Sequence, residues 1–122
     1  MKIEDAEELA RIFRTLSVTA RIRILELAKD RPLCVGALAA ILGVTPGAVS
    51  QHLRVLRDVG LVMAERRGYF VHYRLNHQTL ARWREALAEF WKVREPQEPC
   101  EWAEEGGEAC ARFKPDVRNQ KS

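Results

Sequence analysis

The residues best suited to chemistry follow a Thr45-Pro46 pair near the middle of the chain. This pair is typical of a helix start, because threonine caps free backbone amides and proline fits the first helical position. The face of the expected helix opposite its apolar side carries Gly47, Ser50, Gln51 and Arg54. Small residues allow close approach to a duplex, and glutamine can hydrogen-bond adenine in the major groove. This pattern predicts a DNA-reading helix.

A second basic group lies about a dozen residues later, where Arg66, Arg67 and Arg74 flank a turn at Gly68. Arginines in such a hairpin can contact the DNA backbone or minor groove. The candidate DNA-binding residues are therefore Thr45, Gly47, Ser50, Gln51, His52, Arg54, Arg66, Arg67 and Arg74. For His52, a phosphate contact and a structural hydrogen bond are both open. We expect Tyr69, Phe70 and Tyr73 to pack within the hairpin. For the helix that begins at Thr45-Pro46, the alternative is that its polar face is only solvated and does not contact DNA.

The chain also has three cysteines, Cys34, Cys100 and Cys110. An odd number cannot pair completely within one chain, and thiols that stay reduced fit a reducing compartment. The start of the chain is acidic and amphipathic, unlike a secretory signal, and no stretch reaches the roughly 18 apolar residues of a membrane span. We therefore expect a cytoplasmic protein that does not enter a membrane.

Alternating periodicities predict the elements that must position these residues. Helical spacing of apolar residues predicts helices at about 4–16, 19–29 and 35–42, a helix opened by Thr45-Pro46 and stopped by Gly60, and a last helix from Thr79 onward. The segments 61–67 and 69–75 are rich in β-formers and predict a hairpin. Ser17 and Thr19 are candidate caps of the second helix, whose Ile22 and Leu25 should be buried. The apolar faces expected for the first and last helices comprise Ala6, Leu9, Ala10, Phe13, Leu16, Leu80, Trp83, Leu87, Phe90 and Trp91.

Charge divides the 122 residues into two unequal parts. Residues 1–94 carry 16 basic and 10 acidic side chains, a formal charge of +6, whereas residues 95–122 carry 4 and 7, a charge of −3. We expect residues 1–94 to form a DNA-binding and dimerisation domain and residues 95–122 an acidic tail with two cysteines. A chain of this length excludes a large two-domain enzyme, and no catalytic motif is visible, so we expect no enzymatic activity and no organic cofactor.

The predicted fold is mainly α with a small β-hairpin wing, a dimeric winged helix-turn-helix. Three stretches, LSVTARIRILELA (16–28), PLCVGALAAILGVTPGAVSQHLRVLRDVGLV (32–62) and ERRGYFVHYRL (65–75), resemble the ArsR family of metal-responsive winged-helix repressors. The second helix departs from the family pattern, with Val18-Thr19-Ala20-Arg21 where an Asp-Pro-Thr-Arg-like run is usual. The resemblance implies a bacterial repressor that binds an inverted-repeat operator as a homodimer through its first and last helices, and that an inducer releases. A DNA-independent interaction module is a competing class, against which the basic hairpin argues.

The resemblance also bears on the inducer. Arsenic sensors of the family carry a Cys-Val-Cys run where this chain has Cys34-Val35-Gly36, and the last helix offers only His77 where zinc sensors carry Asp and His pairs. Three thiolates satisfy arsenite or antimonite, whereas zinc usually takes four ligands. The predicted inducer is therefore arsenite or antimonite, bound by Cys34, Cys100 and Cys110. Cys34 could instead be a small buried hydrophobe, and Cys100 with Cys110 could form a redox or persulfide switch.

Overall fold

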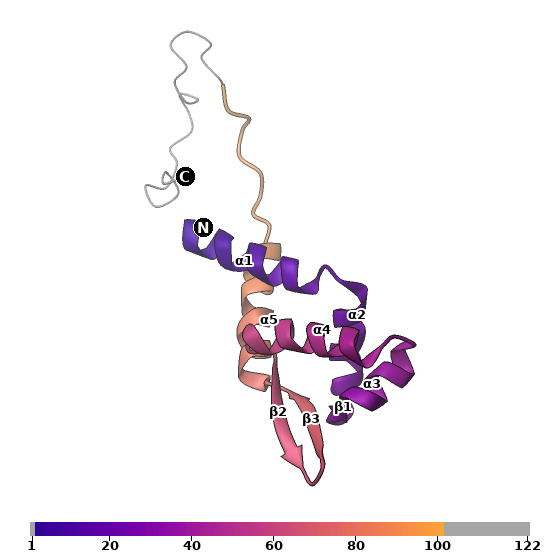
Figure 1. Cartoon of the computed structure of the whole chain (residues 1–122). Coiled ribbons are helices and arrows are strands. Elements are labelled where there is room, and N and C mark those ends of the chain that lie inside the picture. The colour runs from indigo at the N-terminus through magenta and orange to yellow at the C-terminus, as the bar shows by residue number, and fades with distance from the viewer. Residues whose placement is uncertain (1, 102–122) are drawn as a thin grey trace.

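The computed structural model describes residues 2–101, which contain five helices and a three-stranded sheet. The elements are α1 (Ile3–Leu16), α2 (Thr19–Ala28), β1 (Leu33–Cys34), α3 (Val35–Leu42), α4 (Pro46–Asp58), β2 (Val62–Arg67), β3 (Phe70–Leu75) and α5 (His77–Trp91). The hairpin of β2 and β3 projects from one end of the body, and α1 crosses the opposite end beside α5 (Figure 1). The mainly α fold with a hairpin wing is confirmed.

The core forms around α4. Val49, Leu53 and Leu56 recur at helical spacing and are completely or almost completely buried. They belong to one cluster with Ile24 of α2 and Leu38 of α3. Because helix-forming residues and apolar spacing coincide here, this inner face follows directly from the sequence.

Helix ends agree with the sequence at α2, α3 and α4, but the capping residue of α2 and the start of α5 differ from the prediction. Gly43 ends α3 in the left-handed region at φ 69°, and Thr45 Oγ1 accepts a hydrogen bond from the Ala48 amide at 3.1 Å. The predicted Ser17 or Thr19 cap of α2 is wrong, since Val18 occupies that position without a side-chain hydrogen bond. The helix α5 begins two residues before Thr79, because Asn76 Oδ1 accepts hydrogen bonds from the amides of residues 78 and 79.

The sheet contains one strand more than the predicted hairpin. Its order is β1-β3-β2, and all neighbours are antiparallel. The two-residue strand β1 pairs Leu33 with Tyr73 and Cys34 with His72. Two residues are too short for a period to be seen, so only the pairing with β3 defines this strand. It ties the start of α3 to the wing.

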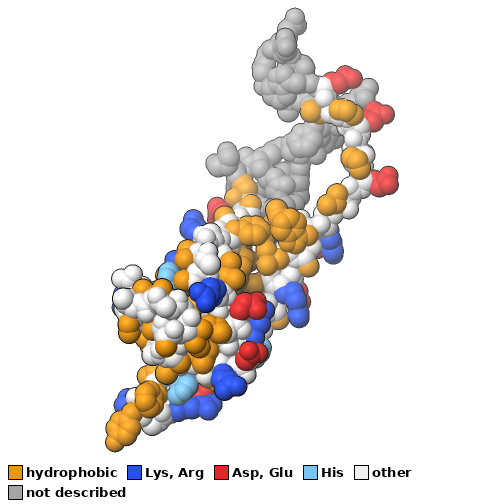
Figure 2. Space-filling model, turned by 90° about the vertical axis from the view of Figure 1, so that its right-hand side faces the viewer, with side chains coloured by type: hydrophobic (Ala, Val, Ile, Leu, Met, Phe, Trp, Pro, Cys, Tyr) orange, Lys and Arg blue, Asp and Glu red, His pale blue; other side chains and the backbone are white. Residues whose placement is uncertain are grey.

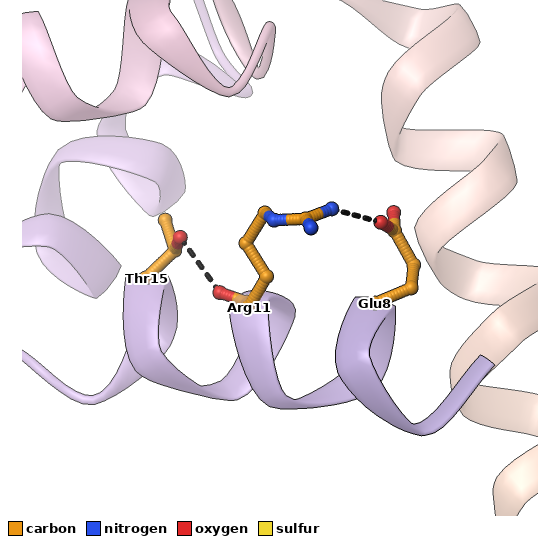
Figure 3. A network of polar contacts seen from close by, with 3 residues as sticks. All are labelled: Glu8, Arg11 and Thr15. Atoms are coloured by element: carbon orange, nitrogen blue, oxygen red, sulfur yellow. Dashed lines mark hydrogen bonds and ion pairs between the residues drawn. The ribbon is translucent and has the colours of Figure 1, made fainter. Parts of the chain in front are cut away.

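The buried face of α1 overlaps the expected one only in part, since Leu9 and Leu16 lie on the core side as expected. Leu9, Ile12 and Thr15 are buried, whereas Ala6, Ala10 and Phe13 of the predicted face are exposed. Thr15 can be buried because its hydroxyl donates a hydrogen bond to the Arg11 carbonyl oxygen at 2.9 Å; the Arg11 side chain pairs with Glu8 (Figure 3).

The last turn of α5 and one face of α2 are also more exposed than the sequence suggested. Trp83 is buried, but Phe90 and Trp91 are exposed. The Phe90 ring contacts the ring of Phe13 on α1 edge to face, with ring centroids 5.6 Å apart. Ile22, which we expected to be buried, is 46% exposed, while Ile24 and Leu25 of the same helix face the core. Adjacent apolar residues make either face of α2 compatible with burial, and packing selects one of them.

The chain leaves α5 at Lys92, and residues 92–101 form no helix or strand. The expected boundary between residues 94 and 95 follows shortly after the helix end, and most of the expected acidic tail lies outside the described residues. No helix among residues 2–101 is both long and apolar enough to span a bilayer.

Two apolar residues of α3 provide a matched test of the core. Leu38→Ala should lower the free energy of unfolding by roughly 2–5 kcal/mol, because Leu38 is 1% exposed and its truncation leaves a cavity. Ile41→Ala, at a position that is 50% exposed on the same helix, should cost less than about 1 kcal/mol. Urea unfolding monitored by circular dichroism measures both values, and similar losses in the two variants would contradict this arrangement.

Candidate nucleic-acid interface

The polar face of α4 points away from the core. Gly47, Ser50, Gln51 and Arg54 are all exposed, because the buried Val49, Leu53 and Leu56 occupy the opposite face of the helix. Thr45 caps the helix, and Gly47 leaves open space at its first turn, where an added methyl group would meet no atom within 4 Å. A capped helix start without bulky side chains can approach the floor of a DNA groove.

His52 lies at the edge of this face and is half-buried. Its Nδ1 accepts a hydrogen bond from Nε of Arg21 on α2 at 3.4 Å, and Nη1 of Arg21 donates to the Thr15 carbonyl oxygen at 3.2 Å. His52 therefore makes the structural hydrogen bond that the sequence analysis left open as one of its two possible roles. Arg21 joins the end of α1 to α4, a role that sequence reasoning missed because its partners lie 6 and 31 residues away.

The three wing arginines lie on both faces of the sheet. The register pairs Met63 with Arg74 and Arg67 with Phe70, which places Arg67 and Arg74 on one face and Arg66 on the other. Nε of Arg66 donates to the Gly68 carbonyl oxygen at the turn, at 3.4 Å. All three arginines are exposed. The wing therefore presents positive charge to both sides rather than along one stripe.

Glu65 partly neutralises this charge. Its Oε2 lies 3.6 Å from Nη2 of Arg67 and 3.4 Å from Nε of Arg74. Sequence reasoning did not single out Glu65, although a lone acidic residue among the hairpin arginines was a visible signal. Because all three side chains are well exposed, the pairing is weak and a phosphate can compete for the arginines.

The tip of the wing is apolar and exposed. Tyr69 is 98% exposed, so its expected packing within the wing is wrong, whereas Phe70, although 61% exposed, contacts the ring of His72 within the wing. Tyr73 packs partly against the core. Figure 2 shows apolar side chains at the lowest point of the molecule, with Lys and Arg side chains beside them. Gly68 forms the turn at φ 64°, and Tyr69 follows it at the exposed end of the hairpin.

The predicted thiol ligands are not brought together among the described residues. Cys34 is half-buried and precedes the first residue of α3, whereas Cys100 is exposed. β1 lies beside the wing, and the segment 92–101 leaves α5 at the opposite end of the body (Figure 1). Cys110 lies outside the described residues. No three His, Cys, Asp or Glu side chains among residues 2–101 converge closely enough to hold a metal ion.

Comparison with known proteins identifies relatives of the segment that contains the helix-turn-helix and the start of the wing. Residues 19–64 match the model of the bacterial regulatory protein, arsR family. The chain is 40% identical over 92 residues to the HTH-type transcriptional regulator CmtR of Mycobacterium tuberculosis. The aligned region covers 75% of this chain and 78% of that protein. It is 38% identical over 79 residues to the transcriptional repressor SmtB homolog of Synechocystis, which covers 63% and 60% of the two chains.

A solved structure supports the same fold. The crystal structure of a "possible transcriptional regulator for arsenical resistance" superposes with a TM-score of 0.62 at 36% identity, over 66% of this chain and 84% of that chain. The match to the Synechocystis relative spans only 60% of that protein's length.

Removing the wing's acidic group should strengthen binding to duplex DNA. Glu65→Gln removes the charge that pairs with Arg67 and Arg74, so both arginines become available to phosphates. The slope of log affinity against log salt should steepen by up to about 0.9 for each added phosphate contact. Fluorescence titration at several salt concentrations measures both effects.

The matched control is Glu26→Gln, which removes an exposed ion pair with Lys29 on α2. It should leave the affinity and the salt slope unchanged. An affinity for Glu65→Gln equal to or below that of the wild type would show that Glu65 does not limit the wing arginines.

Proposed function

Since the chain belongs to the ArsR family of bacterial regulatory proteins, we propose that it is a transcriptional repressor that binds an inverted-repeat operator as a homodimer and is released by a thiophilic inducer. The observation that carries the proposal is the exposed polar face of α4, held outward by its buried opposite face and flanked by a basic wing.

In this proposal α4 enters the major groove. Ser50 and Gln51 contact base edges, while Arg54 and the wing residues Arg66, Arg67 and Arg74 contact the backbone or minor groove. Gly47 permits the approach and Thr45 holds the helix start. His52 orients the helix through Arg21 or contacts phosphate. The salt dependence of binding separates this function from a DNA-independent interaction module, because phosphate neutralisation imposes a steep slope.

Dimerisation through α1 and α5 explains the apolar surface that one chain leaves uncovered. Phe13, Phe90 and Trp91 are exposed on α1 and α5. A groove of about 1010 Å³ between these helices is lined by Leu9, Phe90 and Val93 together with six charged side chains, Lys2, Asp5, Glu8, Glu89, Lys92 and Arg94. A second hollow of about 410 Å³ is almost wholly apolar and lies between α5 and the body. Contiguous apolar surface of this kind typically marks an association site. A two-fold dimer also sets two α4 helices about one DNA turn apart, as an inverted repeat requires.

For the inducer we propose arsenite or antimonite, bound by Cys34, Cys100 and Cys110. The thiol count supports this, and so does the likeness to a structure described in terms of arsenical resistance. Because Cys34 and Cys100 start from opposite ends of the body, the site requires the tail of the same chain or of the partner to reach β1. The alternative is a redox or persulfide switch at Cys100 and Cys110. Under either mechanism, we propose that the protein acts in the cytoplasm and catalyses no reaction.

Disrupting the end of α5 should separate the dimer. Trp91→Glu places a charge on the proposed interface, where the native side chain is 66% exposed in the single chain. Sedimentation velocity should show a monomer with an unchanged circular dichroism spectrum. Tyr69→Glu, the same kind of change at another exposed aromatic on the wing tip, is the control and should stay dimeric. A dimeric Trp91→Glu protein would refute this interface.

The inducer is tested by release from DNA. The reduced protein, bound to a duplex from its own promoter, is titrated separately with arsenite, antimonite, zinc, cadmium and an oxidant. Arsenite and antimonite should lower the DNA affinity by about 5–150-fold, the usual range for such coupling. Single Cys→Ser changes at positions 34, 100 and 110 should preserve DNA binding and abolish this response.

The outcomes separate the two mechanisms. Release by the oxidant alone, lost on Cys100→Ser and Cys110→Ser but not on Cys34→Ser, would support the redox alternative. An arsenite response unchanged in all three variants would exclude both thiol mechanisms.

A further inference from the structure

A row of three potential metal ligands crosses the sheet at one level. Cys34 of β1 lies directly opposite His72 of β3, and His72 lies directly opposite Glu65 of β2. Residues directly opposite in neighbouring strands share a face of the sheet, with Cβ atoms about 4.5–5.5 Å apart. Pairing of β1 with β3 thus brings together a thiol and an imidazole that are 38 positions apart in the sequence.

This face of the sheet is not the one that packs on the core. Leu33 and Tyr73, the neighbouring pair of the same two strands, pack against the core. By alternation, Cys34 and His72 point to the other side, where both are half-buried. Neither residue is therefore needed to fill the core, yet both are partly shielded from solvent.

The hydrogen bonding of His72 is incomplete. Its Nδ1 is inaccessible to solvent and has no hydrogen-bond partner, the one such buried side-chain atom among the described residues. The ring edge contacts Phe70, with centroids 6.5 Å apart, which shields the ring further. A shielded imidazole nitrogen without a partner normally needs an explanation. A bound cation would supply the missing interaction.

The chemistry of the pair selects the class of cation. Thiolate sulfur and imidazole nitrogen together suit thiophilic divalent ions such as zinc and cadmium, with zinc bond lengths of about 2.3 Å and 2.0–2.1 Å. One ion can therefore bridge two side chains at cross-strand separation. No three potential ligands converge among the described residues, so Cys34 and His72 provide two protein ligands and solvent completes the coordination.

We propose that Cys34 and His72 form a binding site for a thiophilic divalent cation across β1 and β3. Binding releases the Cys34 thiol proton to solvent and joins the start of α3 to the wing. The inference rests on the proposed function only in taking Cys34 as an inducer ligand, and it adds His72, which sequence reasoning did not assign. It connects a ligand to the wing and to α3, which packs against α4, without the tail.

The test uses the full chain with Cys100→Ser and Cys110→Ser, so that Cys34 is the remaining thiol, and cadmium as the probe. One equivalent should bind and produce a thiolate-to-cadmium absorption in the ultraviolet. His72→Gln should weaken binding by more than about 100-fold, because even outer-shell partners contribute roughly 10–100-fold. His77→Gln, at the exposed start of α5, is the matched control and should bind as the parent does.

A second measurement does not depend on a variant at His72. Cadmium should shift the ring nitrogen resonances of His72, and not those of His77, in the parent protein. Equal cadmium affinity in His72→Gln and the parent, or unshifted His72 resonances, would overturn the site. DNA binding by the metal-free protein is measured in parallel and reports on the proposed function alone, so its absence would reject the repressor and leave the cation site standing.

Discussion

The two-sided helix α4 is the constraint on which the rest of the structure depends. Val49, Leu53 and Leu56 are buried among α2, α3 and the start of β2, so the helix cannot rotate without exposing them. Its polar face is therefore held outward by the same packing that stabilises the body. The hydrogen bond from Arg21 to His52 adds a lateral restraint that reaches α1. Stability and the proposed DNA reading consequently use opposite faces of one element.

The short strand β1 joins the wing to α3, which packs against α4. It immediately precedes α3 and pairs with β3, so Leu33 and Cys34 connect the wing to the first helix of the helix-turn-helix. The wing carries both charge and its partial compensation, since Glu65 pairs with two of the arginines. A ligand at this strand junction would act between the wing and α3, which packs against α4.

A single chain leaves part of its apolar surface uncovered. The exposed ring of Phe90 contacts those of Phe13 and Trp91 along α1 and α5, and grooves open beside them. Within residues 2–101 these three rings remain exposed. Association of two copies would bury this surface and place the two α4 helices in a two-fold arrangement. The exposed apolar surface of one chain is thus consistent with the symmetry of the proposed operator.

Local patterns in the sequence determined the helices, the ends of α3 and α4, the hairpin and the outward face of α4, because each depends on residues a few positions apart. Tertiary structure alone decided the strand β1, the exposed side of Ile22, and the pairs Arg21–His52 and Cys34–His72. These depend on segments distant in the chain, whose pairing no periodicity encodes. The residue types and their spacing thus determined which side chains suit DNA reading and soft ions, and packing decided which of them meet.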